Sequence, residues 1–189
     1  MMKRWALFLS GRGSTATAAM DMLDEVDIRL VVSNKVTAYG LKKAKRLGVP
    51  SLLVGQGADK KIHWEKLDEE LRNRGVNAIF LLGFMRLVPE SFLKNWQGRI
   101  WNIHPSLLPA FPGAKALERA IESRSDLGAT IHDVIVEMDA GKVCLQKKLN
   151  WDHDLAAELY EHPQTGFSAL EQTLVRKFIM KQSLRGDLA

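Results

Sequence analysis

The chain has 189 residues, of which 46% are hydrophobic and 26% charged, a composition typical of a folded domain and not of a disordered chain. Its length suits one core, so we expect a single domain over residues 1–189, and its formal net charge of +5 comes from scattered Lys and Arg that favour small anionic ligands over nucleic acid. A lone cysteine, Cys144, excludes an internal disulfide, and no apolar run reaches the roughly 18 residues of a membrane span, so we expect a cytoplasmic protein.

Short apolar runs alternate with segments of helical period along the first half of the chain. Strands are expected at residues 5–10, 28–33, 51–54, 78–82 and 99–104. Helices are expected to begin near Thr15, Tyr39, Lys60 and Pro89, where apolar residues recur every three or four positions. This alternation predicts an α/β fold with a doubly wound, mostly parallel sheet.

The pattern changes after His104. A proline-rich loop at residues 105–113 leads to an expected helix at 114–123. Two further strands, at 128–136 and 143–151, are separated by a turn that contains Asp139 and Gly141, and we expect them to pair antiparallel at the edge of the sheet. A final helix is expected from Asp154 to about Met180, with a break near Pro163 and Gly166.

Residues 10–15 read Ser-Gly-Arg-Gly-Ser-Thr and join the first expected strand to the first expected helix. Small residues there let backbone N–H groups approach an anion, which predicts a phosphate site, although a plain tight turn explains the pattern as well. With Ala16 the run also fits the Gly-x-Gly-x-x-Ala pattern of dinucleotide-binding proteins. That pattern requires an acidic residue after the second strand, and Asn34 and Lys35 stand there instead.

A second segment with chemical potential lies at the end of the fifth expected strand. Asn102 and His104 are two residues apart, so their side chains project from the same face of the strand. An isolated Asn-x-His pair is more often structural than catalytic. Here Pro105 to Pro109 turn the chain away at the carboxyl edge of the sheet, where open α/β folds bind their ligands.

These segments resemble a known family. Residues 101–109 read Trp-Asn-Ile-His-Pro-Ser-Leu-Leu-Pro, with Phe-Pro-Gly at 111–113, and this resembles the signature of the folate-dependent formyltransferase family, most closely its glycinamide ribonucleotide branch. Further segments agree in order and spacing at residues 10–14, 32–35, 83–87, 128–132 and 138–141. The similarity covers about residues 5–150 and implies a Rossmann-like formyltransferase fold.

The resemblance implies a catalytic trio of Asn102, His104 and Asp139. When an amine attacks the formyl carbon of 10-formyltetrahydrofolate, Asn102 and protonated His104 would stabilise the oxyanion that forms. Asp139 would hold His104 charged and help move a proton from the amine to the leaving nitrogen, so the chemistry requires no metal. On spacing alone Asp139 is equally well explained as a turn residue, and its neighbours Asp133 and Glu137 as solvent-facing charges.

The resemblance also implies two sets of binding residues. The folate co-substrate is expected at Lys61, Phe84, Met85, Arg86, Leu87, Val88, Asn102 and Asp139. The phosphorylated acceptor is expected at Gly11, Arg12, Gly13, Ser14, Thr15 and Pro105. Without the resemblance, most of residues 84–88 would be interpreted as core and Lys61 as a solvated helix lysine. Small molecules are the expected partners, of a monomer or a homodimer.

The departures from the family pattern lie on the acceptor side. Thr15 stands where the family has Asn, residues 113–117 lack its histidine, and Glu161–His162 falls two positions early, which leaves Pro163 and Gln164 in the matching places. Three alternatives therefore stay open. A methionyl-tRNA formyltransferase would have a further RNA-binding domain, an amino-sugar nucleotide formyltransferase would differ at the acceptor, and a non-catalytic folate-binding protein would have no need of the trio.

Overall fold

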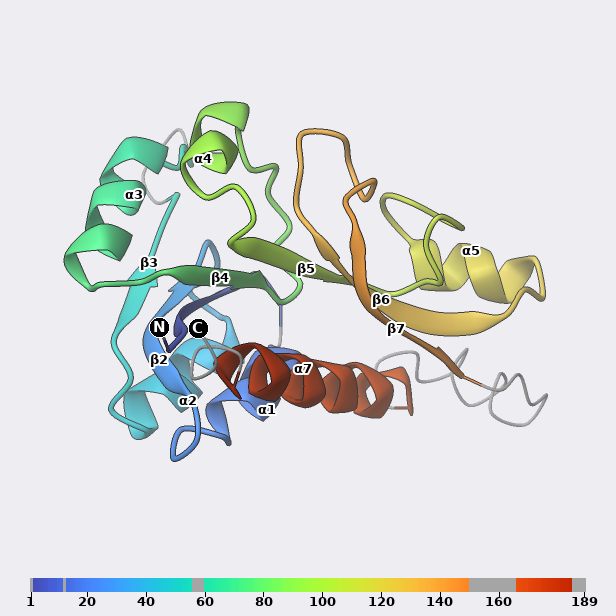
Figure 1. Ribbon diagram of the computed structural model, residues 1–189, viewed down its shortest axis with the longest axis horizontal. Coiled ribbons are helices and arrows are strands. Elements are labelled where there is room, and N and C mark those ends of the chain that lie inside the picture. The colour runs from blue at the N-terminus through green and yellow to red at the C-terminus, as the bar shows by residue number, and fades with distance from the viewer. Residues whose placement is uncertain (1, 12, 56–59, 150–165, 185–189) are drawn as a thin grey trace.

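A mixed sheet forms the centre of the molecule (Figure 1). The computed structural model describes residues 2–11, 13–55, 60–149 and 166–184. The strands of the sheet are β1 (Arg4–Leu9), β2 (Asp27–Ser33), β3 (Ser51–Leu53), β4 (Ala78–Leu81), β5 (Ile100–His104), β6 (Leu127–Asp133) and β7 (Val143–Leu149). They lie in the order β3-β2-β1-β4-β5-β6-β7. The first five are mutually parallel, and β6 and β7 add an antiparallel edge, as the sequence predicted.

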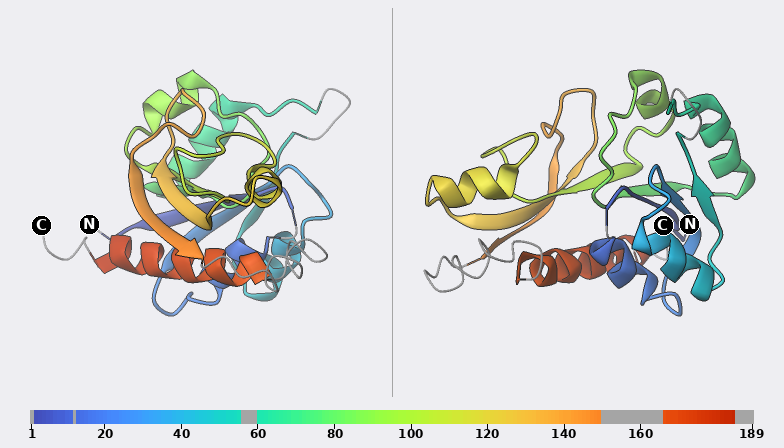
Figure 2. Two further views of the ribbon diagram at one scale, coloured as in Figure 1. Left: turned by 90° about the vertical axis from the view of Figure 1, so that its right-hand side faces the viewer. Right: turned by 180° about the vertical axis from the view of Figure 1, so that it is seen from behind.

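Helices cover both faces of this sheet. In chain order they are α1 (Ser14–Met20), α2 (Tyr39–Arg46), α3 (Trp64–Asn73), α4 (Glu90–Asn95), α5 (Ala116–Glu122) and α7 (Gly166–Leu184). Figure 1 shows α3 and α4 on one face and α1, α2 and α7 on the other. Seen from behind in Figure 2, α5 and the β6–β7 hairpin lie at the opposite end of the molecule from α3. The sheet is therefore doubly wound, which confirms the expected fold class.

An aromatic cluster fixes α7 against the middle of the sheet. The ring of Phe178 on α7 lies 5.4 Å from Phe80 on β4 and 5.5 Å from Trp101 on β5, between ring centroids. Trp5 on β1 completes the cluster, 5.5 Å from Trp101. Apolar residues of α7 recur at three- and four-residue spacing, so one stripe of the helix faces this cluster. The β5 strand is thereby held firmly on the face opposite the side chains of Asn102 and His104.

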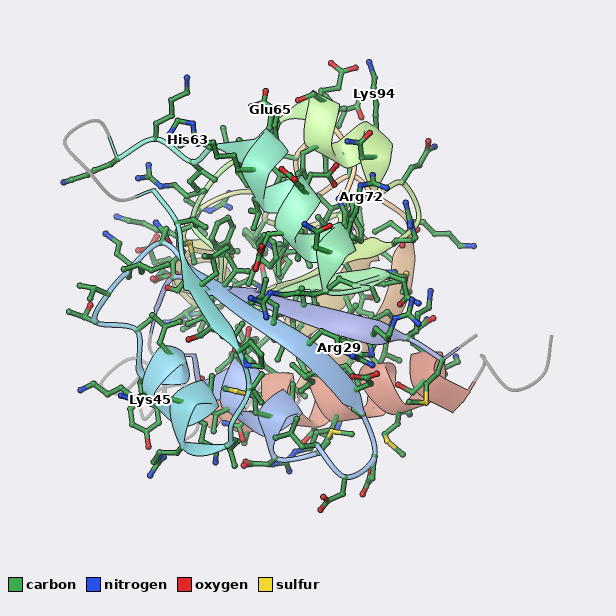
Figure 3. All side chains as sticks on the ribbon, turned by 90° about the vertical axis from the view of Figure 1, so that its left-hand side faces the viewer. Arg29, Lys45, His63, Glu65, Arg72 and Lys94 are labelled. Atoms are coloured by element: carbon green, nitrogen blue, oxygen red, sulfur yellow. The ribbon has the colours of Figure 1, made fainter. Side chains whose placement is uncertain are left out.

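The other face of the sheet has its own core beneath α3 and α4. Leu67 and Leu71 of α3 and Phe92 of α4 pack there with Phe8 and Ile79 of the sheet. The outer sides of these helices are charged, and Figure 3 shows Glu65, Arg72 and Lys94 directed away from the sheet. Because β1 is buried on both faces, its sequence is a continuous apolar run and does not alternate.

The element boundaries differ from the sequence predictions in several places. The sixth strand ends at Asp133 although apolar residues continue, because Ile135 and Val136 are 42% and 60% exposed in a loop beyond the sheet. The third helix begins at Trp64, and α5 begins at Ala116 because Lys115 before it has a left-handed backbone with φ 54°. The last helix is described from Gly166, so its expected start at Asp154 and break at Pro163 lie outside the described residues.

Candidate active site

The candidate site lies where the chain changes direction across the sheet. From β1 the chain continues to β2 and β3 on one side, and from β4 it continues to β5 on the other. Ligands of open α/β sheets bind at the carboxyl ends of the strands beside such a switch point. The loops that follow β1 and β4 meet there, since the backbone N–H of Ser10 donates to the carbonyl of Gly83 over 3.1 Å.

The antiparallel pairing of β5 and β6 arranges the next residues. Asn102 is opposite His132 and His104 is opposite Thr130 in the register. The amide Nδ2 of Asn102 lies 3.2 Å from Nε2 of His132. Directly opposed residues in an antiparallel pair share a face, so β5 and β6 present an amide and two imidazoles on one side of the sheet.

Asp139 reaches this face from the turn between β6 and β7. Its Oδ2 lies 3.3 Å from Nδ1 of His104, and its Oδ1 lies 3.5 Å from Nε2 of His132. The backbone N–H of Gly113 donates to Oδ2 over 2.7 Å. The turn is tightly constrained, because Asp139 has a φ of 55° and a Cβ at Gly141 would lie 1.8 Å from the carbonyl oxygen of Asp133. The structure therefore brings the three expected catalytic residues together.

His104 is more enclosed than the sequence suggested. Its side chain is 6% exposed, and its Nε2 donates to the carbonyl of Phe111 over 2.9 Å. With Asp139 beside Nδ1, both ring nitrogens face oxygen acceptors, so only the doubly protonated ring donates to both. The expected direct hydrogen bond from His104 to an oxyanion would require the ring to leave Phe111. In the arrangement described, Asn102 is the more accessible donor.

His132 is a site residue that the sequence analysis did not select. Its Nδ1 lies 2.9 Å from the carbonyl of Asp133, which only accepts, so Nδ1 carries a proton. Burial lowers the pKa of His132, and its backbone hydrogen bond to Asp133 and the charge of Asp139 oppose that shift only in part. The neutral ring then has an unprotonated Nε2, which accepts from the Asn102 amide. The sequence offered one signal for His132: it lies two residues after Thr130 on the strand expected beside the edge of the sheet, so both side chains share a face.

The expected folate segment divides into buried and exposed parts. The ring of Phe84 packs against Phe8 with centroids 5.3 Å apart, and Val88 also packs against the core, so neither side chain is free for a ligand. Met85 and Leu87 are 76% and 78% exposed, and Arg86 is exposed between them. Lys61 is exposed just before α3, whose Trp64 contacts Phe84 at a centroid distance of 6.4 Å.

The expected phosphate loop is open. Gly11 and Ser14 are exposed, whereas Thr15 is buried and Pro105, after His104, is half-buried. Gly13, directly before α1, has a left-handed φ of 74°, a backbone conformation in which a side chain would be strained. Ser14 also borders a hollow of about 430 Å³ between α1, α2 and α7 that none of the trio lines. Arg12 and Pro163 lie outside the described residues.

Two general features concern ligands and surroundings. Within residues 2–11, 13–55, 60–149 and 166–184, no group of three or more His, Cys, Asp or Glu side chains has the arrangement of a metal site. No helix among these same residues is long and apolar enough to cross a bilayer.

Several named proteins are similar to this chain in sequence. The chain is 34% identical over 155 residues to phosphoribosylglycinamide formyltransferase of Haemophilus influenzae, an alignment that covers 78% of this chain and 73% of that protein. It is 36% identical over 151 residues to the human trifunctional purine biosynthetic protein adenosine-3, covering 76% of this chain and 15% of that protein. The chain thus spans 11% to 15% of the length of the trifunctional relatives.

Solved structures give the same grouping. Glycinamide ribonucleotide transformylase 1 from Geobacillus kaustophilus superposes with a TM-score of 0.81 at 32% identity, over 95% of this chain and all of that one. A formyltetrahydrofolate deformylase from Pseudomonas syringae has a TM-score of 0.83 at 20% identity over 99% of this chain and 62% of that one, a likeness of fold alone. Residues 3–167 match the sequence profile of the formyl transferase family. The chain therefore belongs to the formyl transferase family.

Proposed function

We propose that the chain transfers a formyl group from 10-formyltetrahydrofolate to the amine of glycinamide ribonucleotide in purine biosynthesis. The observation that carries this proposal is the convergence of Asn102, His104 and Asp139 at the carboxyl ends of β5 and β6. Relatives named phosphoribosylglycinamide formyltransferase support this acceptor. Both substrates are small molecules, and the oligomeric state, a monomer or a homodimer, stays a prediction.

The reaction is an acyl transfer between two nitrogens. The amine nitrogen of the acceptor forms a bond to the formyl carbon, and the electron pair of the C=O double bond moves to oxygen. When this oxyanion collapses, the bond from carbon to N10 of the folate breaks, and the proton lost by the amine is taken up by N10. A site that catalyses this step needs a donor to the oxyanion and a group that moves the proton.

The residues divide these tasks according to their contacts. We assign the oxyanion to the Asn102 amide, because one of its protons is bonded to His132 and the other is available. Asp139 is assigned the proton transfer, directly or through water, since a carboxylate at the same face can accept a proton from an amine. His104 and the N–H of Gly113 hold that carboxylate in place from one side.

The donor is assigned to the segment after β4. The exposed side chains of Met85, Arg86 and Leu87 would contact the flat pterin ring, and the backbone at Phe84 and Val88 would read its polar edge. Lys61 would approach the glutamate tail. The acceptor phosphate is assigned to the backbone N–H groups of residues 11–15, with Arg12 as a helper and Pro105 beside the reacting amine.

A donor-turnover assay with a panel of amines tests the proposal. Purified protein is given 10-formyltetrahydrofolate and, in turn, glycinamide ribonucleotide, an amino-sugar nucleotide and initiator methionyl-tRNA. We expect turnover with glycinamide ribonucleotide at a kcat/KM at least about a hundredfold above the others, because only a matched acceptor meets the site's buried polar groups. A preference for the amino-sugar nucleotide would correct the acceptor, and folate binding without turnover of any amine would contradict catalysis.

A further inference from the structure

Ser10 joins the two loops assigned to the two substrates, through its hydroxyl as well as through the backbone N–H that donates to the carbonyl of Gly83. Ser10 follows β1, Asn34 follows β2, and Met85 lies in the loop after β4, at the ends of three neighbouring parallel strands. The Oγ of Ser10 donates to Oδ1 of Asn34 over 2.5 Å. The backbone N–H of Met85 donates to the same Oγ over 2.7 Å.

Two of the three residues at this junction are buried. Ser10 and Asn34 are each 8% exposed. A serine hydroxyl has one proton, which Asn34 accepts, and one of its two lone pairs accepts from the Met85 N–H. Removal of the Oγ atom would leave the part-buried N–H of Met85 and the buried Oδ1 of Asn34 without this shared partner, which weakens the link between the loops.

Both loops have exposed residues directly beside this junction. Gly11, directly after Ser10, is exposed and has no atom within 4 Å of where its Cβ would be. Met85 has its backbone held by Ser10 while its side chain is 76% exposed. A ligand that orders either loop therefore also sets the position of the shared hydroxyl.

We propose that Ser10 is a positioning residue that couples the two substrates, so that a phosphorylated acceptor in the loop at residues 10–15 strengthens folate binding at Met85. The proposal rests on the proposed function, which assigns those loops to acceptor and donor. Two ligands that favour the same arrangement of a shared element raise each other's affinity by an equal factor. Ser10 is such an element because its Oγ belongs to one loop and bonds to the other.

The test is the affinity of the folate product with and without acceptor. Calorimetry of the wild-type chain with tetrahydrofolate is expected to give a dissociation constant at least about fivefold lower when glycinamide ribonucleotide is present, the lower end of ordinary coupling between sites. In Ser10→Ala the ratio is expected to fall toward one, since only the backbone bond from residue 10 to Gly83 still joins the loops. Ser33→Ala is the matched control: Ser33 is fully buried at the end of β2, but its hydroxyl bonds only to Lys35 of its own loop, so the coupling should persist.

A second measurement needs no variant and covers the case in which Ser10→Ala does not fold. In the wild-type chain, glycinamide ribonucleotide alone is expected to slow hydrogen exchange at the Met85 amide, although that amide lies on the donor loop. Unchanged exchange, a wild-type ratio of one, or a ratio retained in Ser10→Ala would overturn the coupling. If neither ligand binds the wild-type chain, the proposed function fails instead.

Discussion

The catalytic face and the loop at residues 10–15 differ in how completely they are organised. At the proposed catalytic face, Asp139 is held by His104 and the N–H of Gly113 before any substrate arrives. The loop has exposed Gly11 and Ser14 beside a hollow, with Ser10 as its buried anchor. Preorganised groups lower the barrier of the chemical step, whereas open loops contribute binding. Changes at the face should therefore alter kcat, and changes in the loop should alter KM.

The largest expected effect is at His104. His104→Ala removes the partner that orients Asp139 and should lower kcat by roughly 10² to 10⁴, the range for a positioned acid–base group. Folate affinity should be retained, because the folate surface proposed at Met85 and Leu87 does not include the His104 ring. His63→Ala, an exposed histidine before α3, is the control. Steady-state transfer with folate binding measures both, and a near-normal kcat in a folded His104→Ala would remove the trio from the mechanism.

Asp139→Asn is expected to lower kcat by a comparable factor of about 10² or more, because the amide that replaces the carboxylate cannot take a proton from the amine. The Gly113 N–H still finds an oxygen acceptor, so the fold and folate binding should be kept. Glu137→Gln changes a charge in the same loop without touching the site and serves as the control. Equal kcat values for the two variants would show that the loop's charge, and not Asp139, matters.

A smaller effect is expected from the turn that carries Asp139. In Gly141→Ala the new Cβ would lie 1.8 Å from the Asp133 carbonyl, so the backbone must shift. Overpacking of this kind costs about 1–3 kcal/mol of stability, and a displaced catalytic group costs about tenfold or more in rate. Gly48→Ala is the control, because its φ of 70° strains alanine but no atom lies within 4 Å. Thermal unfolding and kcat together should separate the two variants, and unchanged kcat in Gly141→Ala would contradict the preorganised turn.

The open loop should respond differently. Ser14→Asp places a negative charge beside the proposed phosphate site, and two unit charges about 4 Å apart in water repel by about 1 kcal/mol, which corresponds to about a fivefold rise in acceptor KM. An acidic residue in the first turn of α1 favours the helix, so the fold should not suffer. Ser14→Asn is the neutral control. Kinetics at two salt concentrations test the prediction, since the rise should shrink at high salt, and a fall in kcat alone would contradict it.

The sequence predicted the sheet from local signals such as the apolar run of β1, whereas the trio of Asn102, His104 and Asp139 was expected from the resemblance to the formyltransferase family. It did not predict what depends on the pairing of distant strands. His132 becomes a partner of Asn102 only through the antiparallel register of β6. The hydrogen bond from His104 to the carbonyl of Phe111 depends on the left-handed backbone of Phe111, whose φ is 54°. Arg119 lies over the ring of Phe111. Such contacts leave no periodic trace in the sequence.

The smallest expected effect concerns pH and His132. Its environment includes Asp139, His104 and the backbone of Asp133, and burial is the largest influence, lowering its pKa below the ordinary value. The unfolded chain takes up a proton at this residue near pH 6.5, whereas the folded chain resists protonation until a lower pH. Between these two values the unfolded state binds more protons, so the free energy of unfolding should fall as the pH falls through that window and stay constant above it.

Activity should also fall as the pH falls and His132 takes up a proton, because the neutral ring accepts a hydrogen bond from Asn102 and the protonated ring cannot. His132→Gln removes the titration but keeps an acceptor, so its free energy of unfolding should fall less between pH 7 and the acid limit than that of the wild-type chain. Denaturant unfolding across this range measures the slope, with His63→Gln as the exposed control. If His132→Gln and the wild-type chain lose stability in parallel as the pH falls, burial of a neutral His132 does not organise the catalytic face.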